Sequence, residues 1–396
     1  MSSAEVRCPA CGVVPMEVFH SQDGLPVNSC LLLDDKSQAV GFPTGIMRLG
    51  VCRTCGFIAN TAFDPRASEY SSRYEETQAF SPKFQEFAAD LAKRWIDRYD
   101  IVGKDIVEIG CGKGEFLVLM CELGENRGVG IDPGVHPERI DGKVGERIRF
   151  HADFYDDQYG PLDADVVVCR HTLEHIAPVE EFMRTVRRGI GDRLDTVVLF
   201  ELPDVLRVLN ETAFWDVYYE HCSYFTPGSL ARLFRRTGFD VLDISLDYDD
   251  QYILIEAVPS SAPTGQTAPL PIEPDLDAIA SAVEHFASTF DETIARWRSD
   301  VAEVVSSGGK VVLWGSGSKG VAYLTSLGLV DEIRYVVDIN PFKHGKFLAG
   351  TGQLIVPPEF LKEYRPDLVV AMNPVYTDEI GAELESMGVG AKLVAV

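Results

Sequence analysis

Short apolar runs alternate with amphipathic stretches through the middle of the chain, between residues 70 and 258. Apolar runs of strand length are found at 105–110, 128–132, 165–169, 196–202, 241–246 and 252–258. Runs without polar alternation are typical of strands that are buried on both faces of a parallel sheet. Helical periodicity is found at 81–98 and 229–238. The pattern predicts an α/β fold built on a mainly parallel sheet.

A second α/β pattern follows a break in composition. Residues 259–271 are rich in proline, serine and threonine, which is typical of a linker. A long helical pattern covers 276–306, and apolar runs then occur at 310–314, 333–338, 368–372 and 392–396. At 396 residues the chain is longer than one ordinary hydrophobic core supports. We therefore expect three domains, at residues 1–69, 70–258 and 259–396.

The first region carries two Cys-x-x-Cys pairs, Cys8 with Cys11 and Cys52 with Cys55, each followed by glycine. The two-residue gap lets both thiolates of a pair reach one ion, and four thiolates leave a tetrahedral zinc ion without an open position. The pattern predicts a structural Zn²⁺ in an N-terminal zinc-binding module. Four unligated cysteines or a redox pair are the alternatives. The segment between the pairs is long enough to carry short strands of its own.

Composition and charge narrow the choice of partner. The apolar fraction of 46% and the charged fraction of 24% are typical of a soluble globular protein. The net charge of −25 disfavours nucleic-acid binding, which depends on cationic contacts with phosphates. No apolar run reaches the roughly 18–20 residues that cross a bilayer, and the start of the chain lacks the apolar core of a signal peptide. We expect a cytoplasmic protein whose partner is a small molecule, and neither a nucleic acid nor a membrane.

A glycine-rich loop after the first strand of the middle region gives the strongest chemical signal. Gly110, Gly112 and Gly114 allow the backbone to turn against a ligand at the start of a helix. Asp132 closes the next strand about 20 residues further on, where an acid can bind a ribose. Glu108 opens the loop with an acid, which suits a cationic sulfonium better than the pyrophosphate of a nicotinamide dinucleotide.

This loop resembles motif I of the class I S-adenosylmethionine-dependent methyltransferases, whose core has a Rossmann-like fold. The resemblance implies an S-adenosyl-L-methionine site in which Asp132 binds the ribose, while Asp153 and Phe154 flank the adenine. It also implies that His171 and His175 line the site after the fourth strand. A structural loop-to-helix junction is the alternative: we favour it for His175, whereas His171 stays open between that role and cofactor binding.

An unusual aromatic segment at 214–225 (Phe-Trp-Asp-Val-Tyr-Tyr-Glu-His-Cys-Ser-Tyr-Phe) combines six aromatic side chains with two acids, a histidine and a thiol. It follows the strand at 196–202, so it lies at the carboxyl edge of the predicted sheet. Open α/β sheets bind their ligands at that edge. We therefore expect this segment to face the methyl donor.

Several motifs together resemble one family, the three-domain C-methyltransferases that act on nucleotide-linked 4-keto deoxysugars. They are 218–225 (Tyr-Tyr-Glu-His-Cys-Ser-Tyr-Phe), 318–320 (Ser-Lys-Gly) and 338–346 (Asp-Ile-Asn-Pro-Phe-Lys-His-Gly-Lys). With the four cysteines, these motifs span the chain from end to end. The resemblance implies a zinc-binding module, a methyltransferase core and a Rossmann-like C-terminal substrate-binding domain. It also places Tyr74 near the substrate.

The resemblance implies a mechanism that acid–base chemistry supports. A carbon next to a ketone becomes nucleophilic when a base removes its proton, and histidine is an efficient base near neutral pH. We predict that His221 takes the proton, that Glu220 orients or activates its ring, and that Tyr218 hydrogen-bonds the enolate oxygen. If the acceptor is oxygen or nitrogen, His221 serves as general base in the same way. A packed aromatic loop without a catalytic role is the alternative.

The loop at 315–320 (Gly-Ser-Gly-Ser-Lys-Gly) has Gly-x-Gly-x-x-Gly spacing between a strand and a helix. Gly315, Gly317 and Lys319 would bind a diphosphate through backbone amides and an ammonium group. Three interpretations are open: in order of preference, the loop anchors the substrate nucleotide, binds a second dinucleotide, or is retained for packing.

Further charged residues follow this loop. Asp338 ends the next strand, at the position of a ribose contact. Lys343 and Lys346 either add positive charge to the same mouth or are solvated.

This chain departs from the family pattern at three places. It has Gly-Lys-Gly at 112–114 for an Asn-Asp-Gly turn, Asp-Asp-Gln-Tyr-Ile-Leu at 249–254 for a Gly-Gly-Ser-Leu-Arg run, and its own sequence at 315–320 for Gly-Ala-x-Ala-Lys-Gly. The departures bear on the acceptor. C-methylation of a nucleotide-linked keto deoxysugar ranks first, and O- or N-methylation of another small metabolite second. A nicotinamide-dependent oxidoreductase using the C-terminal loop and a zinc-anchored scaffold with a vestigial core rank below.

Overall fold

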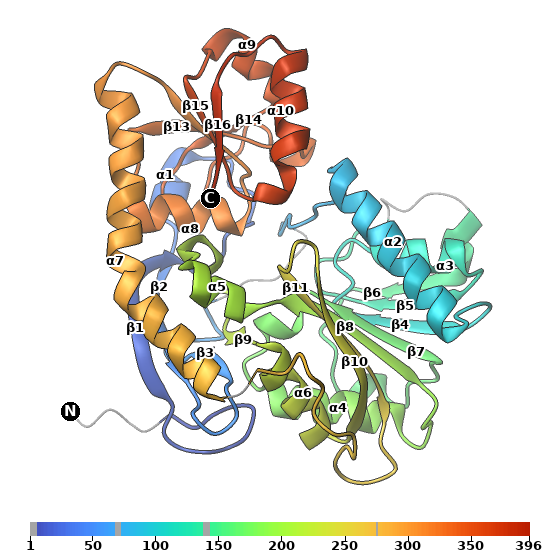
Figure 1. Cartoon of the computed structure of the whole chain (residues 1–396). Coiled ribbons are helices and arrows are strands. Elements are labelled where there is room, and N and C mark those ends of the chain that lie inside the picture. The colour runs from blue at the N-terminus through green and yellow to red at the C-terminus, as the bar shows by residue number, and fades with distance from the viewer. Residues whose placement is uncertain (1–5, 68–72, 138–142, 275) are drawn as a thin grey trace.

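The computed structural model describes residues 6–67, 73–137, 143–274 and 276–396, and in these ranges the strands form three sheets (Figure 1). The predicted boundary between residues 69 and 70 lies outside the described residues. Across the ranges that are described, none of the helices combines the length and the apolar character needed to span a membrane.

The central sheet has seven strands in the order β10-β11-β8-β7-β4-β5-β6. The neighbouring pairs from β8 to β6 are parallel, whereas β11 runs antiparallel to both β8 and β10. The strands are β4 (Asp105–Ile109), β5 (Arg127–Ile131), β6 (Ile148–His151), β7 (Val166–Arg170), β8 (Val197–Pro203), β10 (Phe239–Asp247) and β11 (Tyr252–Pro259). All six apolar runs of the middle region form strands whose ends lie within two residues of the expected bounds. The sequence pattern did not predict β6.

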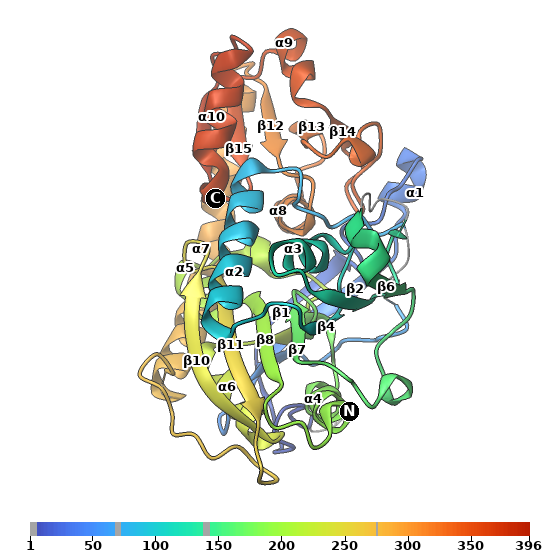
Figure 2. The same cartoon turned by 90° about the vertical axis from the view of Figure 1, so that its right-hand side faces the viewer.

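Helices cover both faces of this sheet (Figure 2). On one face, α2 (Pro82–Tyr99) and α3 (Glu115–Leu123) pack their buried side chains, Trp95 and Phe116 among them, against the strands. On the other face lie α4 (Val179–Ile190) and α6 (Pro227–Arg236). The start of α2 is set by Ser81, whose hydroxyl accepts a hydrogen bond from the Phe84 amide at 3.2 Å, and by Pro82 in the first turn.

The C-terminal unit repeats the parallel plan with five strands in the order β14-β13-β12-β15-β16. It follows the long helix α7 (Leu276–Ser306), as the helical pattern predicted. Its elements are β12 (Val311–Trp314), α8 (Ser318–Leu327), β13 (Ile333–Val337), β14 (Leu354–Val356), α9 (Leu361–Tyr364), β15 (Leu368–Ala371), α10 (Thr377–Ser386) and β16 (Lys392–Ala395). The predicted α/β fold class, with a second Rossmann-like unit, is confirmed.

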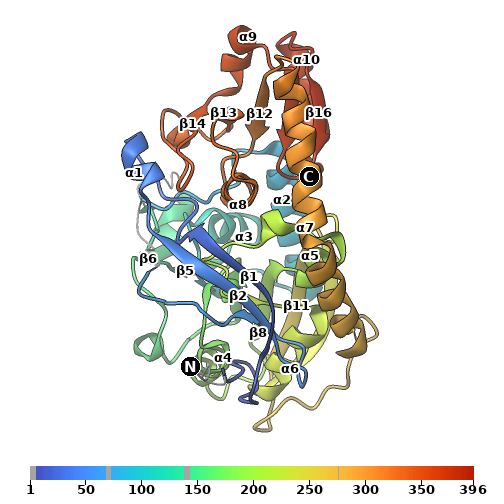
Figure 3. The ribbon, with the colours of Figure 1, turned by 90° about the vertical axis from the view of Figure 1, so that its left-hand side faces the viewer.

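The N-terminal sheet is antiparallel and lies beside α7 and below the C-terminal unit (Figure 3). Its own strands are β1 (Glu17–Pro26), β2 (Thr44–Val51) and β3 (Ile58–Asn60), with the short helix α1 (Lys36–Val40) before β2. The fourth strand, β9 (Ser223–Tyr224), comes from the aromatic segment of the middle region. The sheet therefore joins two parts of the chain that are far apart in sequence.

A shared apolar core joins the N-terminal sheet, the C-terminal unit and the segment that follows β8. It includes Met47 from β2, Phe214 from the aromatic segment, Phe286 from α7 and Tyr323 from α8, all of which are fully buried. The ring planes of Phe214 and Tyr323 stack with their centroids 5.8 Å apart. The aromatic content of residues 214–217 therefore serves packing between the units.

Candidate active site

One cavity of about 950 Å³ lies between the central sheet and the C-terminal unit. Loops of both α/β units line it. Its walls contain these residues of the predicted site: Tyr74, Glu108, Gly110, Gly112, Asp132, Asp153, Phe154, His171, Tyr218, His221, Gly315, Gly317, Lys319, Asp338 and Lys343. Gly114 and Glu220 lie behind the wall. The structure thus gathers most of the predicted cofactor, catalytic and substrate residues around a single space.

The glycine loop turns tightly between β4 and α3. Gly110, Gly112 and Gly114 all have positive φ angles, at 70°, 53° and 87°. A Cβ atom on Gly110 would lie 1.9 Å from the Thr172 hydroxyl oxygen, so this position accepts no side chain. Asp132, after β5, accepts hydrogen bonds from the Gly112 amide at 3.0 Å and the Gly134 amide at 2.6 Å. Its carboxylate therefore fixes the loop and faces the cavity from the end of the strand.

Two carboxyl groups beside this loop have buried oxygen atoms without a hydrogen-bond partner. They are Oε2 of Glu108 and Oε2 of Glu76. Burial raises the pKa of Glu108 to about 8 and that of Glu76 to about 7. A cation placed here would favour their ionised forms. Lys113 forms an ion pair with Glu76, with its Nζ atom 3.6 Å from Oε2. The same ammonium donates a hydrogen bond to the Tyr74 carbonyl at 2.6 Å.

His171 belongs to a buried ionic cluster. Its Nε2 lies 2.8 Å from Glu201, which also binds Arg170 at 2.5 Å. Burial alone would lower the pKa of His171, but Glu201 and Glu174 raise it to about 9. The imidazole is therefore a cation at neutral pH. Its φ of 46° places it in the left-handed region at the exit of β7.

The aromatic segment presents Tyr218 and His221 to the cavity. Their ring centroids are 4.1 Å apart, and the His175 ring lies 4.8 Å from His221. Burial, followed by the charges of His175, His171 and Lys319, lowers the pKa of His221 well below its usual range. Within the described residues the His221 ring has no hydrogen-bond partner. It is thus a neutral imidazole with a free ring nitrogen, the state that accepts a proton.

Glu220 points away from this pair. Its carboxylate accepts hydrogen bonds from the Asn28 side chain, the Ser29 amide and the Ser318 hydroxyl, each at 3.2 Å. Those three donors come from the N-terminal sheet region and from the start of α8. The sequence-based expectation that Glu220 orients the His221 ring is wrong for this geometry, since the carboxylate is satisfied by other parts of the chain.

The C-terminal loop supplies positive charge on the opposite side of the cavity. Lys319 donates to Asp216 at 2.9 Å and to the Gln251 side chain at 3.3 Å, and Arg207 pairs with the same Asp216 at 2.5 Å. Burial lowers the pKa of Lys319. Arg207 also pairs with Glu211 at 2.7 Å, so two cations and two carboxylates form this cluster, and Lys319 lies on the cavity wall.

Asp338 ends β13 as predicted and is occupied by its own loop. It accepts from the Ser316 amide at 3.0 Å and the Asn340 amide at 2.9 Å, and Lys343 lies 3.5 Å away. Lys343 is buried, and Lys346 pairs with Asp34 of the N-terminal region instead of facing the cavity.

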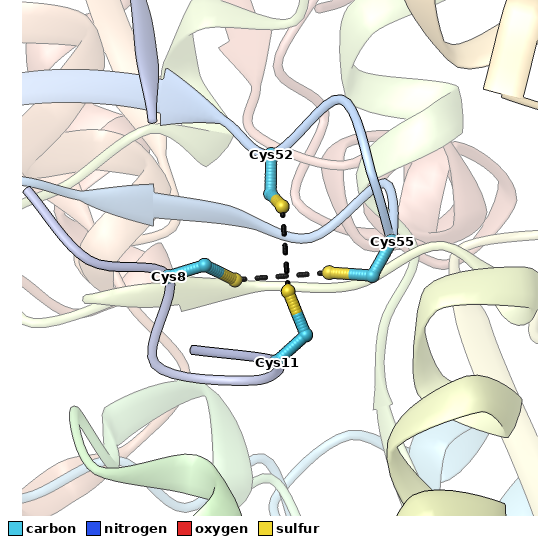
Figure 4. A group of neighbouring side chains, drawn as sticks. All are labelled: Cys8, Cys11, Cys52 and Cys55. Atoms are coloured by element: carbon cyan, nitrogen blue, oxygen red, sulfur yellow. Dashed lines mark hydrogen bonds between the residues drawn. The ribbon is translucent and has the colours of Figure 1, made fainter. Parts of the chain in front are cut away.

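Four cysteine side chains converge at the base of the N-terminal sheet (Figure 4). The sulfur atoms of Cys8 and Cys55 are 3.7 Å apart, and those of Cys11 and Cys52 are 3.5 Å apart. Thiolates bound tetrahedrally about 2.3 Å from a zinc ion lie about 3.8 Å from one another. The donor set and spacing therefore fit such an ion.

Comparison with known proteins identifies two family domains. A model described as "Methyltransferase domain" matches residues 81–244, and one described as "C-methyltransferase C-terminal domain" matches residues 275–396. The C-methyltransferase NovU of Streptomyces niveus is 28% identical over 374 residues, which cover 88% of this chain and 85% of NovU. The chain therefore combines a methyltransferase domain with a C-methyltransferase C-terminal domain. It is a class I S-adenosylmethionine-dependent methyltransferase.

Further similarities cover less than half of this chain. The ribosomal protein L11 methyltransferase of Yersinia pestis is 30% identical over 112 residues, or 26% of this chain and 37% of that protein. Among solved structures, N,N-8-amino-8-demethyl-D-riboflavin dimethyltransferase from Streptomyces davawensis has a TM-score of 0.35 at 21% identity, over 45% of this chain and 56% of that one. Magnesium protoporphyrin IX methyltransferase from Synechocystis has a TM-score of 0.35 at 15% identity, over 45% and 84%.

Sequence reasoning missed several residues of the methyltransferase site. Glu76 has a buried oxygen beside the glycine loop that accepts no hydrogen bond in the described part of the chain, and Gln251 and Asp216 accept hydrogen bonds from Lys319. Glu76 lies two positions after Tyr74, the signal that could have drawn attention to it. Asp216 belongs to the aromatic segment, but its pairing with Lys319 joins residues 103 positions apart, which no local pattern indicates.

Proposed function

We propose that this methyltransferase transfers a methyl group to a carbon next to the ketone of a nucleotide-linked 4-keto deoxysugar. The observation that supports it is the single cavity, in which an acidic glycine loop and a basic one face each other with Tyr218 and His221 beside them. Such a space suits a cationic donor at one end and an anionic acceptor at the other.

At the acidic end, Glu108, Glu76 and Asp132 would hold the donor. When bound, S-adenosylmethionine supplies an electrophilic methyl group on a positively charged sulfur. The Oε2 atoms of Glu108 and Glu76, which accept no hydrogen bond from the described residues, offer acceptors for cationic or hydrogen-bonding groups. Asp132 would bind the ribose, and Asp153 and Phe154, which line the same wall, would flank the adenine.

In the centre, His221 would remove the proton next to the ketone. Its lowered pKa keeps the imidazole neutral, so the ring nitrogen is ready to accept that proton. Tyr218 would donate a hydrogen bond to the oxygen that becomes negative as the enolate forms. Burial raises the pKa of Tyr218 well above its usual range, so the phenol keeps the proton it needs for this role. Tyr74 lines the same cavity and would contact the sugar.

At the basic end, Lys319 and Arg207 would attract the diphosphate of the substrate. Asp216 and Glu211 partly offset these charges before the substrate binds, and the amides at the start of α8 point toward the loop. Gly315 and Gly317 keep this surface free of side chains. Lys343 would raise the local potential from behind Asp338.

A structural Zn²⁺ held by Cys8, Cys11, Cys52 and Cys55 belongs to the proposal. The sulfur spacing fits such an ion, and all four ligand positions would be filled by thiolates. The ion would stabilise the N-terminal module and take no part in the chemistry.

Mass spectrometry tests the proposal directly. The enzyme is incubated with S-adenosylmethionine and a panel of nucleotide-linked sugars that differ only in having a 4-keto or a 4-hydroxyl group. We expect the mass of a keto sugar to rise by one methylene unit. If the carbon next to the ketone carries deuterium, we expect the enzyme without the donor to exchange that deuterium with solvent, and the methyl group to be added to the same carbon. Methylation of the 4-hydroxyl sugars at oxygen, with the keto sugars left unmodified, would contradict the proposal.

A further inference from the structure

We propose that the four-cysteine module is the positioning device for the catalytic segment, defined here as residues 218–225. The inference rests on the proposed zinc ion and on the proposed roles of Tyr218 and His221. It goes beyond them, because it assigns the N-terminal module a task in catalysis through the strand that it shares with the methyltransferase core.

The shared sheet carries the first connection. The second cysteine pair leads directly into β3, and β3 pairs with β9, where Ile58 faces Tyr224 and Ala59 faces Ser223. The Asn60 amide donates to the Cys222 carbonyl at 2.9 Å. Because Cys222 follows His221, this bond holds the peptide next to the proposed base.

Tyr219 provides the second connection, from inside the segment. Its hydroxyl accepts a hydrogen bond from the Asp64 amide at 2.9 Å, and its ring lies 5.3 Å from that of Phe63. A Cβ atom on Gly45 would lie 2.2 Å from the Tyr219 ring, so the ring packs directly against the backbone of β2. Tyr219 is 2% exposed and does not line the cavity, although Tyr218 and His221 do. It anchors the segment to the module while they face the substrate.

A third connection lies next to the cysteines themselves. The Phe57 and Phe225 rings are in contact, with centroids 5.1 Å apart, and Arg232 of α6 donates to the Cys55 carbonyl at 2.9 Å. The second cysteine pair and the residue Phe57 just after it therefore contact both the end of the catalytic segment and the helix α6 that follows it.

The methyltransferase core holds the segment from the other side. The His175 ring lies 3.1 Å from the Glu220 carbonyl, and the Ser223 hydroxyl donates to the Ile176 carbonyl at 2.6 Å. These bonds do not involve the module. Loss of zinc would thus release one side of the segment and misplace His221, while the glycine loop of the core keeps its own contacts.

Hydrogen exchange with and without zinc tests the inference. The full-length protein is compared as purified and after metal removal by a chelator, with zinc content measured in both. We expect faster exchange at 51–60 and at 218–225, unchanged exchange at 105–131, S-adenosylhomocysteine affinity within about twofold, and loss of turnover that returns with zinc. Unchanged exchange at 218–225, or loss of S-adenosylhomocysteine binding together with exchange throughout the core, would overturn the inference.

Two variants probe the same connection with zinc in place. Tyr219→Phe removes one hydrogen bond, and Gly45→Ala forces the Tyr219 ring to move. We expect both variants to speed hydrogen exchange at 218–225 and to lower kcat by roughly three- to tenfold. Gly45→Ala should have the larger effect on both measurements. The control is Arg53→Gln, which breaks the exposed ion pair between Arg53 and Glu17. Hydrogen exchange at 218–225 and kcat should both stay unchanged in this variant. Wild-type exchange at 218–225 in both Tyr219→Phe and Gly45→Ala would refute the positioning role.

These results separate the inference from the function it rests on. If His221→Asn kept normal turnover, the proposed base would be wrong, yet zinc removal would still loosen 218–225 if the module holds the segment. If His221→Asn abolished turnover while zinc removal left that segment protected, the proposed function would stand and the positioning role would fall.

Discussion

The two glycine loops of this methyltransferase share one backbone plan and differ in charge. In both, an acid at the end of the second strand accepts a backbone amide of the loop at 3.0 Å: Asp132 binds Gly112, and Asp338 binds Ser316. In both, the next contact of that acid is an amide two residues further along, from Gly134 or Asn340. The strand–loop–helix plan therefore decides how each loop is held, and not what it binds.

The two loops differ in the charged side chains that lie around them. The central loop lies against Glu108 and Glu76, whose raised pKa values come with buried oxygens that accept no hydrogen bond within the described ranges, and Lys113 pairs with Glu76. The C-terminal loop carries Lys319, which shares Asp216 with Arg207. Both loops line the same cavity, and in the proposed function the central loop would take the cationic donor and the C-terminal loop the anionic acceptor. The comparison shows that two loops with similar glycine spacing can lie among side chains of different charge.

The largest effect is expected between the two loops, at the proposed base. His221→Asn keeps a polar side chain of similar size but removes a group that accepts a proton near neutral pH. We expect kcat to fall by roughly 10²–10⁴-fold, the usual contribution of a general base. Affinity for S-adenosylhomocysteine, measured by calorimetry, should stay within about twofold, since His221 would act on the acceptor.

The exposed His285→Asn on α7 is the matched control and should behave like the wild type. Turnover by His221→Asn close to the wild-type rate would show that the two loops bring substrates together without this base.

A glycine in each loop gives the next comparison. Gly110 has a positive φ, and a Cβ there would lie 1.9 Å from the Thr172 hydroxyl oxygen, whereas a Cβ on Gly317 would meet nothing within 4 Å. We expect Gly110→Ala to lower the free energy of unfolding by about 2 kcal/mol or more, and Gly317→Ala to change it by less than about 0.5 kcal/mol. Chemical denaturation measures both. Equal losses would mean that the two loops are packed alike.

A smaller effect is expected from pH at the acidic loop. Glu76 and Glu108, with pKa values raised to about 7 and about 8 by burial, are largely protonated at pH 6 and ionised at pH 9. The ionised carboxylates attract the sulfonium of S-adenosylmethionine and not the neutral thioether of S-adenosylhomocysteine. The ratio of the two affinities should therefore rise with pH, by roughly tenfold.

Taking the ratio removes the titration of groups that the two ligands share. A Glu108→Gln variant should flatten the rise. A ratio that is constant from pH 6 to pH 9 would show that these carboxyl groups do not sense the sulfonium.

The sequence predicted both loops because their signals are local. Glycine spacing, the preceding apolar strand and the acid about 20 residues on are all readable along the chain, and the two sheets follow from the alternation of apolar runs. The cysteine pairs likewise predicted a cluster that the structure assembles. What the sequence did not show depends on contacts across long separations. Glu220 was expected to serve His221, but its partners are Asn28, Ser29 and Ser318, more than 90 positions away.

The strand pairing of β9 with β3 was missed for the same reason. Two residues are too short for a periodic signal, and pairing is decided by which edge the folded module offers. The sequence also gave no sign that Asp216 neutralises part of the charge on Lys319. Contacts between residues far apart in sequence therefore determine which side chains of a recognisable motif face the cavity.

The central claim, that the two loops bind opposite charges in one cavity, is tested most directly by a crossed titration. S-adenosylmethionine and a nucleoside diphosphate are each titrated by calorimetry into the wild type, Glu108→Gln and Lys319→Met, with the exposed Lys392→Met as control. We expect Glu108→Gln to weaken only the donor and Lys319→Met to weaken only the diphosphate, each by roughly tenfold, and the control to weaken neither. Equal weakening of both ligands by each variant, or no diphosphate binding to the wild type, would contradict the account.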